Sequence, residues 1–350
     1  MTEKNVYANA YDEASAAEYI SREKDWRNGA VVYQVLVDRF APAQDLEAKK
    51  HLYTAPKKLR SWDEVPKKGK YLEDEQLYCH EIDFWGGDLE SLSDRLEYIV
   101  DLGVDVLYLN PIHLGYTNHK YDSLDYQAVS PEFGTREDVI ALADTVHDKG
   151  MKIVLDGVFN HMGRNAEIFQ QALANPESEY RDWFYFGDQY PGGHRAWATA
   201  LNLPELNLEC EDVRNHIYAK PDSVVQSYLN EGIDGWRLDV AYDLGFNYLE
   251  ELTKSAHQAK PGSLVVGEIW NYPSEWFPSV DGVMNFPLRE AIWRMCQGKL
   301  SATTGVAMID KIISDCGIDN ALKSWLILDN HDTARLKNML KHEWQQKIAQ

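Results

Sequence analysis

The stretch Ile233-Asp234-Gly235-Trp236-Arg237-Leu238-Asp239 has the composition of a buried parallel strand that ends in charged residues. Side chains alternate between the two faces of a strand, so Arg237 and Asp239 share one face, whereas Trp236 and Leu238 share the other. In a sheet closed into a barrel, one face fills the interior and the other meets covering helices. Burying an arginine and an aspartate is costly unless they bind each other or a ligand, so the stretch contains either a structural ion pair or part of a site.

Apolar runs of strand length recur along the chain and alternate with segments of helical spacing. The runs cover residues 31–37, 104–109, 152–156, 233–239, 263–268, 280–285 and 324–330. Helices are predicted over 88–103, with Asp88 as N-cap, over 135–149, 212–230 and 246–259, and between 288 and 313. A doubly wound open sheet is the rival arrangement, but no Gly-x-Gly-x-x-Gly follows the first run. The pattern therefore favours an α/β fold of the (β/α)8 TIM-barrel type.

The charge of the chain limits its partners. The formal net charge is −21, which repels phosphate backbones and anionic lipid and argues against nucleic acid and membrane partners. No uniform apolar run is long enough to cross a bilayer, and the N-terminus lacks the pattern of a secretory signal. The four cysteines are scattered without paired spacing, so we expect a cytoplasmic protein with reduced thiols. A neutral small-molecule substrate remains admissible.

Polar residues gather at the C-terminal ends of four predicted strands. They are Asp156 with Asn160 and His161, Arg237 with Asp239, Glu268, and Asn330-His331-Asp332. A single carboxylate of this kind is explained by a cap or a salt bridge. Charged groups at four separate strand ends indicate an active site instead, because this rim is where (β/α)8 enzymes build theirs.

Paired carboxylates suit the cleavage of glycosides, in which one acid stays ionised and another holds a proton near neutrality. Arg237 supplies the opposite charge that would keep Asp239 ionised, as a nucleophile requires. Glu268 follows the apolar run 264–267, an environment that favours the protonated form needed by a general acid. Asp332, beside His331, would bind sugar hydroxyls and favour a distorted, positively charged ring.

The same residues resemble the motifs of the α-amylase superfamily of glycoside hydrolases, over about 31–335. Asp156-Gly157-Val158-Phe159-Asn160-His161 is similar to the third-strand motif, and Gly235-Trp236-Arg237-Leu238-Asp239 to the fourth-strand motif with the nucleophile. Val266-Gly267-Glu268 resembles the fifth-strand acid/base motif, and Asn330-His331-Asp332 the seventh-strand motif with the third carboxylate. Phe84-Trp85-Gly86-Gly87-Asp88-Leu89, Asn118-His119-Lys120-Tyr121-Asp122 and Gly267-Glu268-Ile269-Trp270 look most like the cyclomaltodextrinase, neopullulanase and maltogenic amylase branch.

The resemblance implies a retaining α-glucan hydrolase that cleaves α-1,4, and by extension α-1,6, bonds of maltooligosaccharides or cyclodextrins by double displacement. Asp239 would be the nucleophile, Glu268 the acid/base and Asp332 the stabiliser of the transition state. The residues expected to position the sugar are Arg237, His161, His331, Asp156 and Tyr121. Two alternatives stay open: a transglycosylase on the same substrates, and a catalytically inactive carbohydrate-binding fragment.

Two further residues carry alternatives of their own. Trp270 either stacks on the leaving glucose or packs as core. Asn160 corresponds to a calcium ligand in many relatives, but one oxygen donor does not make a calcium site, and the residue could instead hydrogen-bond the inserted segment. The implied chemistry requires no cofactor.

The pattern also predicts how the chain is divided. Residues 1–30 form a lead-in with a helix over 11–20, residues 31–161 and 208–350 form two parts of the catalytic barrel, and 162–207 form a small inserted subdomain. Residues 41–83 are a polar insertion, either functional or mobile. We expect the barrel to be truncated before its eighth strand and to lack the usual C-terminal β-domain. We also expect no additional β-domain before the barrel, so the resemblance does not imply a dimer, and the oligomeric state stays open.

Overall fold

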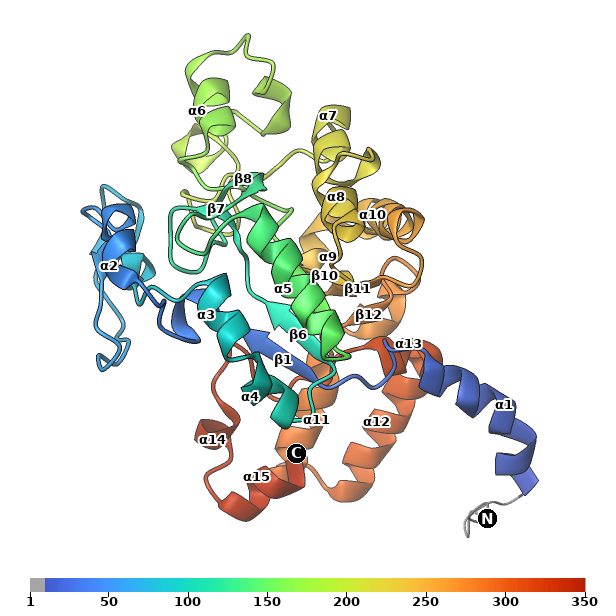
Figure 1. Ribbon diagram of the computed structural model, residues 1–350. Coiled ribbons are helices and arrows are strands. Elements are labelled where there is room, and N and C mark those ends of the chain that lie inside the picture. Colours follow the sequence, from blue (N-terminus) through green and yellow to red (C-terminus); the bar gives the residue numbers. More distant parts are fainter. Residues whose placement is uncertain (1–9, 350) are drawn as a thin grey trace.

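Six parallel strands form one curled sheet at the centre of the computed structural model, which describes residues 10–349 (Figure 1). Each strand pairs with its neighbours in parallel, as the alternation of strands and helices predicts. In spatial order they are β1 (Val32–Val35), β6 (Val106–Leu109), β9 (Lys152–Gly157), β10 (Gly235–Leu238), β11 (Leu264–Gly267) and β12 (Gly282–Val283).

The predicted seventh strand is wrong in extent. Residues 324–330 form only a parallel bridge, between Met284 and Trp325. Asn285 donates its backbone N–H to the Trp325 carbonyl at 2.9 Å, and its side chain then caps the next helix by accepting from Leu288 N. Because the chain turns into a helix after two residues of β12, little strand is left for a seventh ladder to pair with.

The two faces of the sheet separate as the period-two pattern of β10 predicts. Trp236 and Leu238 lie in the large core that the sheet forms with its covering helices. Arg237 points to the other side and is fully buried. A Cβ on Gly235 would lie 2.3 Å from the carbonyl oxygen of Leu264, so only glycine lets β10 and β11 approach this closely.

Helices cover the outer face of the sheet. The prediction over 246–259 matches α10 (Phe246–Ala259), and that over 135–149 matches α5 (Arg136–Asp148) with Thr135 as its N-cap. Asp88 caps a helix as expected, but the single helix predicted there is two, α3 (Leu89–Asp94) and α4 (Leu96–Asp101). The other helices on this scaffold are α7 (Glu211–Arg214), a π-helical turn (Asn215–Ala219), α8 (Val224–Asn230), α9 (Ala241–Leu244), α11 (Phe286–Cys296), α12 (Ala302–Cys316) and α13 (Ile318–Lys323).

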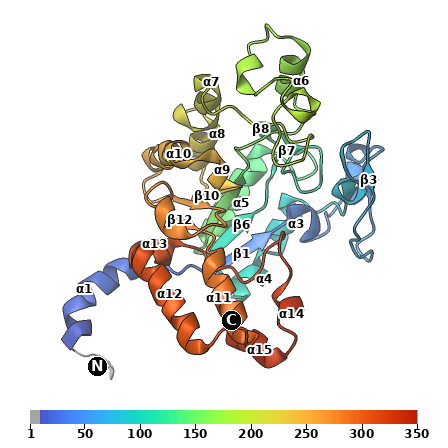
Figure 2. The same ribbon diagram turned by 180° about the vertical axis from the view of Figure 1, so that it is seen from behind.

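Three further helices lie near the ends of the described chain. The helix expected over 11–20 is α1 (Ala10–Lys24), which extends away from the curled sheet, whereas α11 and α12 lie side by side below β12 (Figure 2). The chain then continues through α14 (Leu336–Met339) and α15 (Glu343–Ala349). Within residues 10–349, no helix has both the length and the apolar content needed to cross a membrane.

Two long connections contribute to one end of the curled sheet. Residues 41–83 contain α2 (Leu46–Lys49), β2 (Lys58–Leu59), the hairpin β3 (Tyr71–Leu72) and β4 (Leu77–Tyr78), and β5 (Asp83–Phe84). Residues 162–207 contain α6 (Glu167–Ala174), which lies above β7 (His113–Gly115) and β8 (Ser123–Val129) in Figure 1. Phe169 and Phe184 of this second connection belong to the main core. Its separation as a subdomain stays a prediction.

Candidate active site

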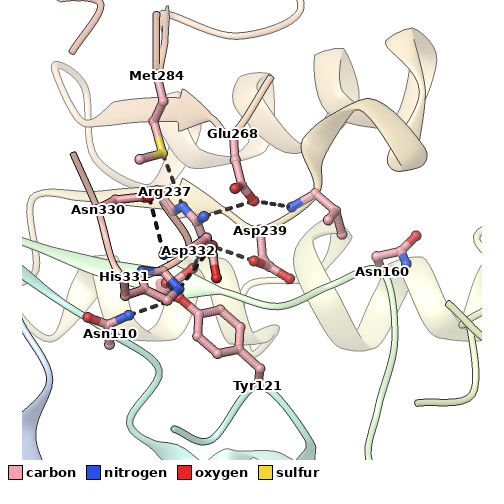
Figure 3. Close-up of polar contacts among 12 residues, drawn as sticks. Asn110, Tyr121, Asn160, Arg237, Asp239, Glu268, Met284, Asn330, His331 and Asp332 are labelled. Carbon is pink, nitrogen blue, oxygen red and sulfur yellow. Dashed lines mark hydrogen bonds and ion pairs between the residues drawn. The ribbon is translucent and has the colours of Figure 1, made fainter. Parts of the chain in front are cut away.

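Arg237 occupies the centre of a buried charge cluster at the C-terminal end of β10 (Figure 3). Its Nη1 donates to Asp156 Oδ1 at 2.7 Å and to Asp239 Oδ1 at 2.9 Å, and its Nη2 lies 2.8 Å from Glu268 Oε2. The predicted partnership with Asp239 is therefore present. The same guanidinium also holds two carboxylates from neighbouring strands.

The register of the sheet brings these side chains together. Arg237 lies opposite Asp156 across the ladder between β10 and β9, and Leu238 lies opposite Gly267 across the ladder between β10 and β11. Asp239 and Glu268 are each the next residue along their strands, so parallel pairing leaves them at the same level. Asp239 donates its backbone N–H to Gly157 O at 3.0 Å, and Glu268 donates to Leu238 O at 2.9 Å, which extends both ladders into the site.

Three carboxylates share one positive charge in this cluster. Burial raises the pKa of Asp239 well above its usual range, Arg237 opposes that effect, and the charges of Asp156 and Glu268 add to it. Arg237 thus acts on Asp239 in the expected direction, but burial and the two other acids act against it, and the ionised state of Asp239 stays a prediction. Charge balance favours a proton held within the cluster.

Glu268 lies between the arginine and the open cavity, and is 3 % exposed. Its Oε2 accepts from the backbone N–H of Val240 at 3.1 Å, and its Oε1 accepts from the indole N–H of Trp270 at 3.2 Å. One face of Trp270 stacks on Phe286, with 3.8 Å between ring centroids, yet the residue is 42 % exposed. Trp270 therefore packs on the first residue of α11 on one side and remains open to a ligand on another.

Asp332 comes from the segment that follows the bridge at Trp325. Its backbone N–H donates to Asn330 Oδ1 at 3.2 Å, and its carboxylate lies 3.3 Å from His331 Nε2. Burial raises the pKa of Asp332, although its side chain is still 49 % exposed. This acid is thus more open to solvent than the pair bound to Arg237.

Two histidines of the site are neutral near pH 7. Burial lowers the pKa of both His161 and His331 to about 4, and Arg237 adds to the effect at His331. His161 Nε2 lies 3.2 Å from the carbonyl oxygen of Tyr121, and His331 Nδ1 lies 2.9 Å from Gln34 Nε2. Neutral imidazoles can each donate and accept a hydrogen bond, which suits sugar hydroxyls.

Tyr121 connects the rim to the buried cluster. Its hydroxyl donates to Asp156 Oδ2 at 2.8 Å and accepts from Asn110 Nδ2 at 2.9 Å. Its ring stacks on His331, with 5.3 Å between centroids and 14° between planes. One face is therefore covered by an imidazole, so stacking of Tyr121 on a sugar stays a prediction for the remainder of the ring.

A cavity of about 980 Å³ joins most of the predicted residues. Its lining includes Asp239, Glu268, Asp332, His161, His331, Tyr121 and Trp270. Arg237 and Asp156 are not part of the lining, because they lie buried beneath the acids. These two residues are thus placed to position the acids and Tyr121 rather than to touch a sugar.

Several residues of the site escaped the sequence reasoning. Tyr108 donates its hydroxyl to Asp156 Oδ2 at 2.5 Å, and Gln34 donates to Asn110 Oδ1 at 3.1 Å. Tyr108 could have been found by applying period-two alternation to β6, and Gln34 is the polar residue within the first apolar run. Trp197 stacks on His161 with 5.7 Å between centroids, a contact made across the chain that leaves no local signal.

Asn160 is buried beside His161. Its Nδ2 lies 3.4 Å from His161 Nδ1, and its backbone carbonyl accepts from Leu206 N at 2.9 Å. Among residues 10–349, no group of three or more His, Cys, Asp and Glu side chains is arranged to hold a metal. Calcium binding at Asn160 stays a prediction, and no step below uses a metal. The backbone contact fits the alternative role of tying down the segment 162–207.

Comparisons with known proteins place the chain among glycosidases. A family model described as "Alpha amylase, catalytic domain" matches residues 34–350. Neopullulanase 2 of Thermoactinomyces vulgaris is 33% identical over 327 residues, which is 89% of this chain and 51% of that relative. The intracellular maltogenic amylase of Bacillus subtilis (strain 168) is 30% identical over 329 residues, 91% of this chain and 52% of that relative. The chain spans about half the length of the curated relatives it matches.

The arrangement of the chain is shared with a solved structure as well. The cyclic α-maltosyl-(1→6)-maltose hydrolase from Arthrobacter globiformis, in complex with maltose, superimposes with a TM-score of 0.80 at 29% identity. The match covers 93% of this chain and 70% of that one. Together with the family model and the neopullulanase match, this shows that the chain belongs to the alpha-amylase family.

Proposed function

We propose that this chain carries the active site of a retaining α-glucan hydrolase, which cleaves glucosidic bonds of maltooligosaccharides or cyclodextrins by double displacement. The observation that carries the proposal is the attachment of Asp239 and Glu268 to one guanidinium, that of Arg237, at the wall of a cavity. Both contacts, 2.9 Å and 2.8 Å, keep the two acids close, as retaining enzymes require (about 5–5.5 Å).

The first displacement uses both acids. Asp239 Oδ1 is engaged by Arg237, which leaves Oδ2 for attack on the anomeric carbon of the sugar. Glu268, at the cavity wall, gives its proton to the glycosidic oxygen as the bond to the leaving sugar breaks. The result is a glycosyl ester on Asp239 and a free sugar with a new hydroxyl group.

The second displacement reverses the roles. Glu268, now ionised, takes a proton from a water molecule, which attacks the anomeric carbon and releases Asp239. Positive charge develops on the sugar ring in both steps, and Asp332 is the carboxylate placed at the cavity to stabilise it. His161 and His331, neutral near pH 7, would hydrogen-bond the hydroxyls of the sugar being cleaved.

Support for the substrate class comes from the relatives' names: a neopullulanase, a maltogenic amylase and a hydrolase of a cyclic maltosyl-maltose. We propose that this protein cleaves α-1,4 glucosidic bonds and, by extension, α-1,6 glucosidic bonds. We further propose that the curled sheet is part of a (β/α)8 barrel with residues 162–207 as an inserted subdomain, and that the protein works in the cytoplasm.

The test is Asp239→Asn in the intact protein, assayed for maltotriose hydrolysis by chromatography of the products. Removing a nucleophile should lower kcat by at least about a thousandfold. The matched control is Asp144→Asn, at an exposed position on α5, which should keep the wild-type rate. Near wild-type turnover by Asp239→Asn would remove the assignment.

A second measurement tests the stereochemistry. NMR of the first product released by the wild-type protein should show the α-anomer, because two displacements at one carbon preserve its configuration. A β-anomer as the first product would contradict double displacement, even if Asp239→Asn is inactive. Products longer than the substrate would indicate that a sugar, rather than water, also accepts the glycosyl group.

A further inference from the structure

The hairpin β3–β4 presents two tyrosines to the outside of residues 41–83. Tyr71 and Tyr78 are directly opposite one another in the antiparallel register, and their rings meet edge to face with 5.3 Å between centroids. Their side chains are nevertheless 46 % and 41 % exposed. Exposed aromatic rings that gather at one place on a surface commonly mark a binding site.

The position of the pair is fixed from below. The other cross-strand pair of the hairpin, Leu72 and Leu77, faces the opposite side and packs into a small core with Tyr53 and Phe84. Because side chains alternate along each strand, burial of the leucines forces the tyrosines outward. The outward rings are therefore a consequence of how the hairpin is anchored.

The end of the hairpin is bonded to the loop that carries Tyr121. Asn118 donates its backbone N–H to Glu81 O at 2.7 Å and its side-chain N–H to His80 O at 2.7 Å. His119 Nε2 lies 3.2 Å from Glu81 Oε1. The turn that follows the hairpin is thus tied to the loop of Tyr121 by three contacts.

The hairpin also lines the cavity of the catalytic acids. Tyr71, Tyr78 and Lys68 border the same space of about 980 Å³ as Asp239 and Glu268. This volume is at the upper end for ligand pockets, about 300–1,000 Å³. The Lys68 ammonium lies 5.9 Å from the centre of the Tyr78 ring, so a hydrogen-bond donor for hydroxyl groups is next to the aromatic surface.

The order of strands tells which part of a substrate reaches the hairpin. Residues 41–83 follow β1, whereas Glu268 and Trp270 follow β11, four strands away in the curled sheet. Glu268 protonates the leaving oxygen, so the leaving sugar lies on the β11 side. The sugars on the other side of the cleaved bond, toward the nonreducing end, then extend toward β1 and the hairpin.

We propose that Tyr71 and Tyr78, with Lys68, form a binding platform for glucose units on the nonreducing side of the cleaved bond, remote from the acids. The inference rests on the proposed function for its direction along the chain. Sugar rings offer apolar C–H faces that pack on tyrosine rings, and hydroxyl edges that accept from the ammonium of Lys68. The platform favours long linear maltooligosaccharides over short ones.

The binding test uses Tyr71→Ala/Tyr78→Ala in the full chain, combined with Glu268→Gln to prevent turnover. Calorimetry should show that the affinity for maltoheptaose falls by about tenfold, because two ring contacts with the sugar are lost. The affinity for maltotriose should change by less than about twofold. Tyr71→Phe/Tyr78→Phe keeps both rings and should bind as before. Tyr98→Ala removes a tyrosine that is 49 % exposed on α4, outside the cavity, and is the matched control.

The outcomes separate the platform from the proposed function. The platform would be overturned if the alanine double variant lost equal affinity for both sugars, or lost no affinity for maltoheptaose. It would also be overturned if the phenylalanine double variant lost affinity for maltoheptaose while the alanine double variant kept it. A thermal unfolding curve shows whether the double variant is folded. If it is not, Tyr71→Ala alone must reduce the affinity for maltoheptaose more than the affinity for maltotriose; otherwise the platform is overturned. Absence of hydrolysis by the wild-type protein, with tyrosine-dependent binding of maltoheptaose, would remove the proposed function and leave the platform.

The direction is tested with turnover. In a variant that keeps Glu268, maltoheptaose labelled at its reducing end should be cut nearer to the nonreducing end than in the wild type, because the platform no longer holds the nonreducing units. An unchanged pattern, or a shift toward the reducing end, would overturn the placement of the hairpin on that side.

Discussion

Glu132→Gln should destabilise the protein by removing the counterion of two lysines. Glu132 is 2 % exposed, and its carboxylate lies 2.7 Å from Lys57 Nζ and 3.2 Å from Lys120 Nζ. Lys120 is fully buried beside the Phe84 and Phe133 rings, and burial lowers its pKa while Glu132 opposes that change. Without the carboxylate, the Lys120 ammonium is left buried without its counterion.

The magnitude follows from the carboxyl group. Burial alone would raise the pKa of Glu132, but Lys120 and Lys57 lower it from 4.5 to about 2. A depressed acid stabilises the folded state above its unfolded pKa and loses that contribution as the pH falls toward the folded value. Glu132→Gln should therefore lower the free energy of unfolding by about 3 kcal/mol at pH 7 and by roughly 1 kcal/mol at pH 3.

Urea titrations followed by tryptophan fluorescence measure this difference. Glu179→Gln, at an exposed position, is the charge-matched control and should change stability by less than about 0.5 kcal/mol. Lys57→Met should lower the free energy of unfolding less than Glu132→Gln does, because the ion pair between Glu132 and the more deeply buried Lys120 remains. A Glu132→Gln protein as stable as the wild type at pH 7 would refute the reasoning, as would a difference that does not shrink in acid.

Three other predictions concern the cavity and its support. Tyr108→Phe removes the hydroxyl that binds Asp156 at 2.5 Å and should lower kcat/KM for maltotriose between roughly tenfold and a hundredfold; an unchanged value would contradict this. Burial lowers the pKa of both His161 and His331 to about 4, so the pH profile of kcat/KM between about pH 5 and 8 should keep its shape in His331→Gln. Loss of a limb of the profile near pH 6.5 would contradict this prediction. Burial raises the pKa of Asp38 to about 6, so the stability of the wild type relative to Asp38→Asn should fall as the pH rises from about 4 to 6. Urea titrations measure this difference, and parallel curves of unfolding free energy against pH for the two proteins would contradict it.

The sequence could predict the strands and the acids because both follow from short periodic patterns. The run 233–239 contains β10, and the alternation of its side chains separates Trp236 from Arg237 as observed. Parallel register then carries Asp239 and Glu268 to the same level and places Asp156 opposite Arg237, so residues far apart in sequence meet without any long-range information. Order along the chain was sufficient for this part of the site.

Other features depend on contacts that no local pattern encodes. The helix over 88–103 keeps its apolar spacing across Arg95, yet the backbone breaks there into α3 and α4. The segment 324–330 is apolar enough for a strand but has only two residues of β12 beside it. The outward tyrosines of the β3–β4 hairpin lie in a polar insertion, and only the packing of Leu72 and Leu77 beneath them fixes their direction.

The sharing of one guanidinium among three carboxylates means that none of these acids can be substituted without affecting the other two. Replacing one of them changes how strongly Arg237 attracts the two that remain. The losses measured for separate substitutions of Asp156, Asp239 and Glu268 should accordingly sum to more than the loss in the triple variant. The cluster is a single thermodynamic unit, so the contribution of each acid to the rate can be measured only by multiple-mutant cycles.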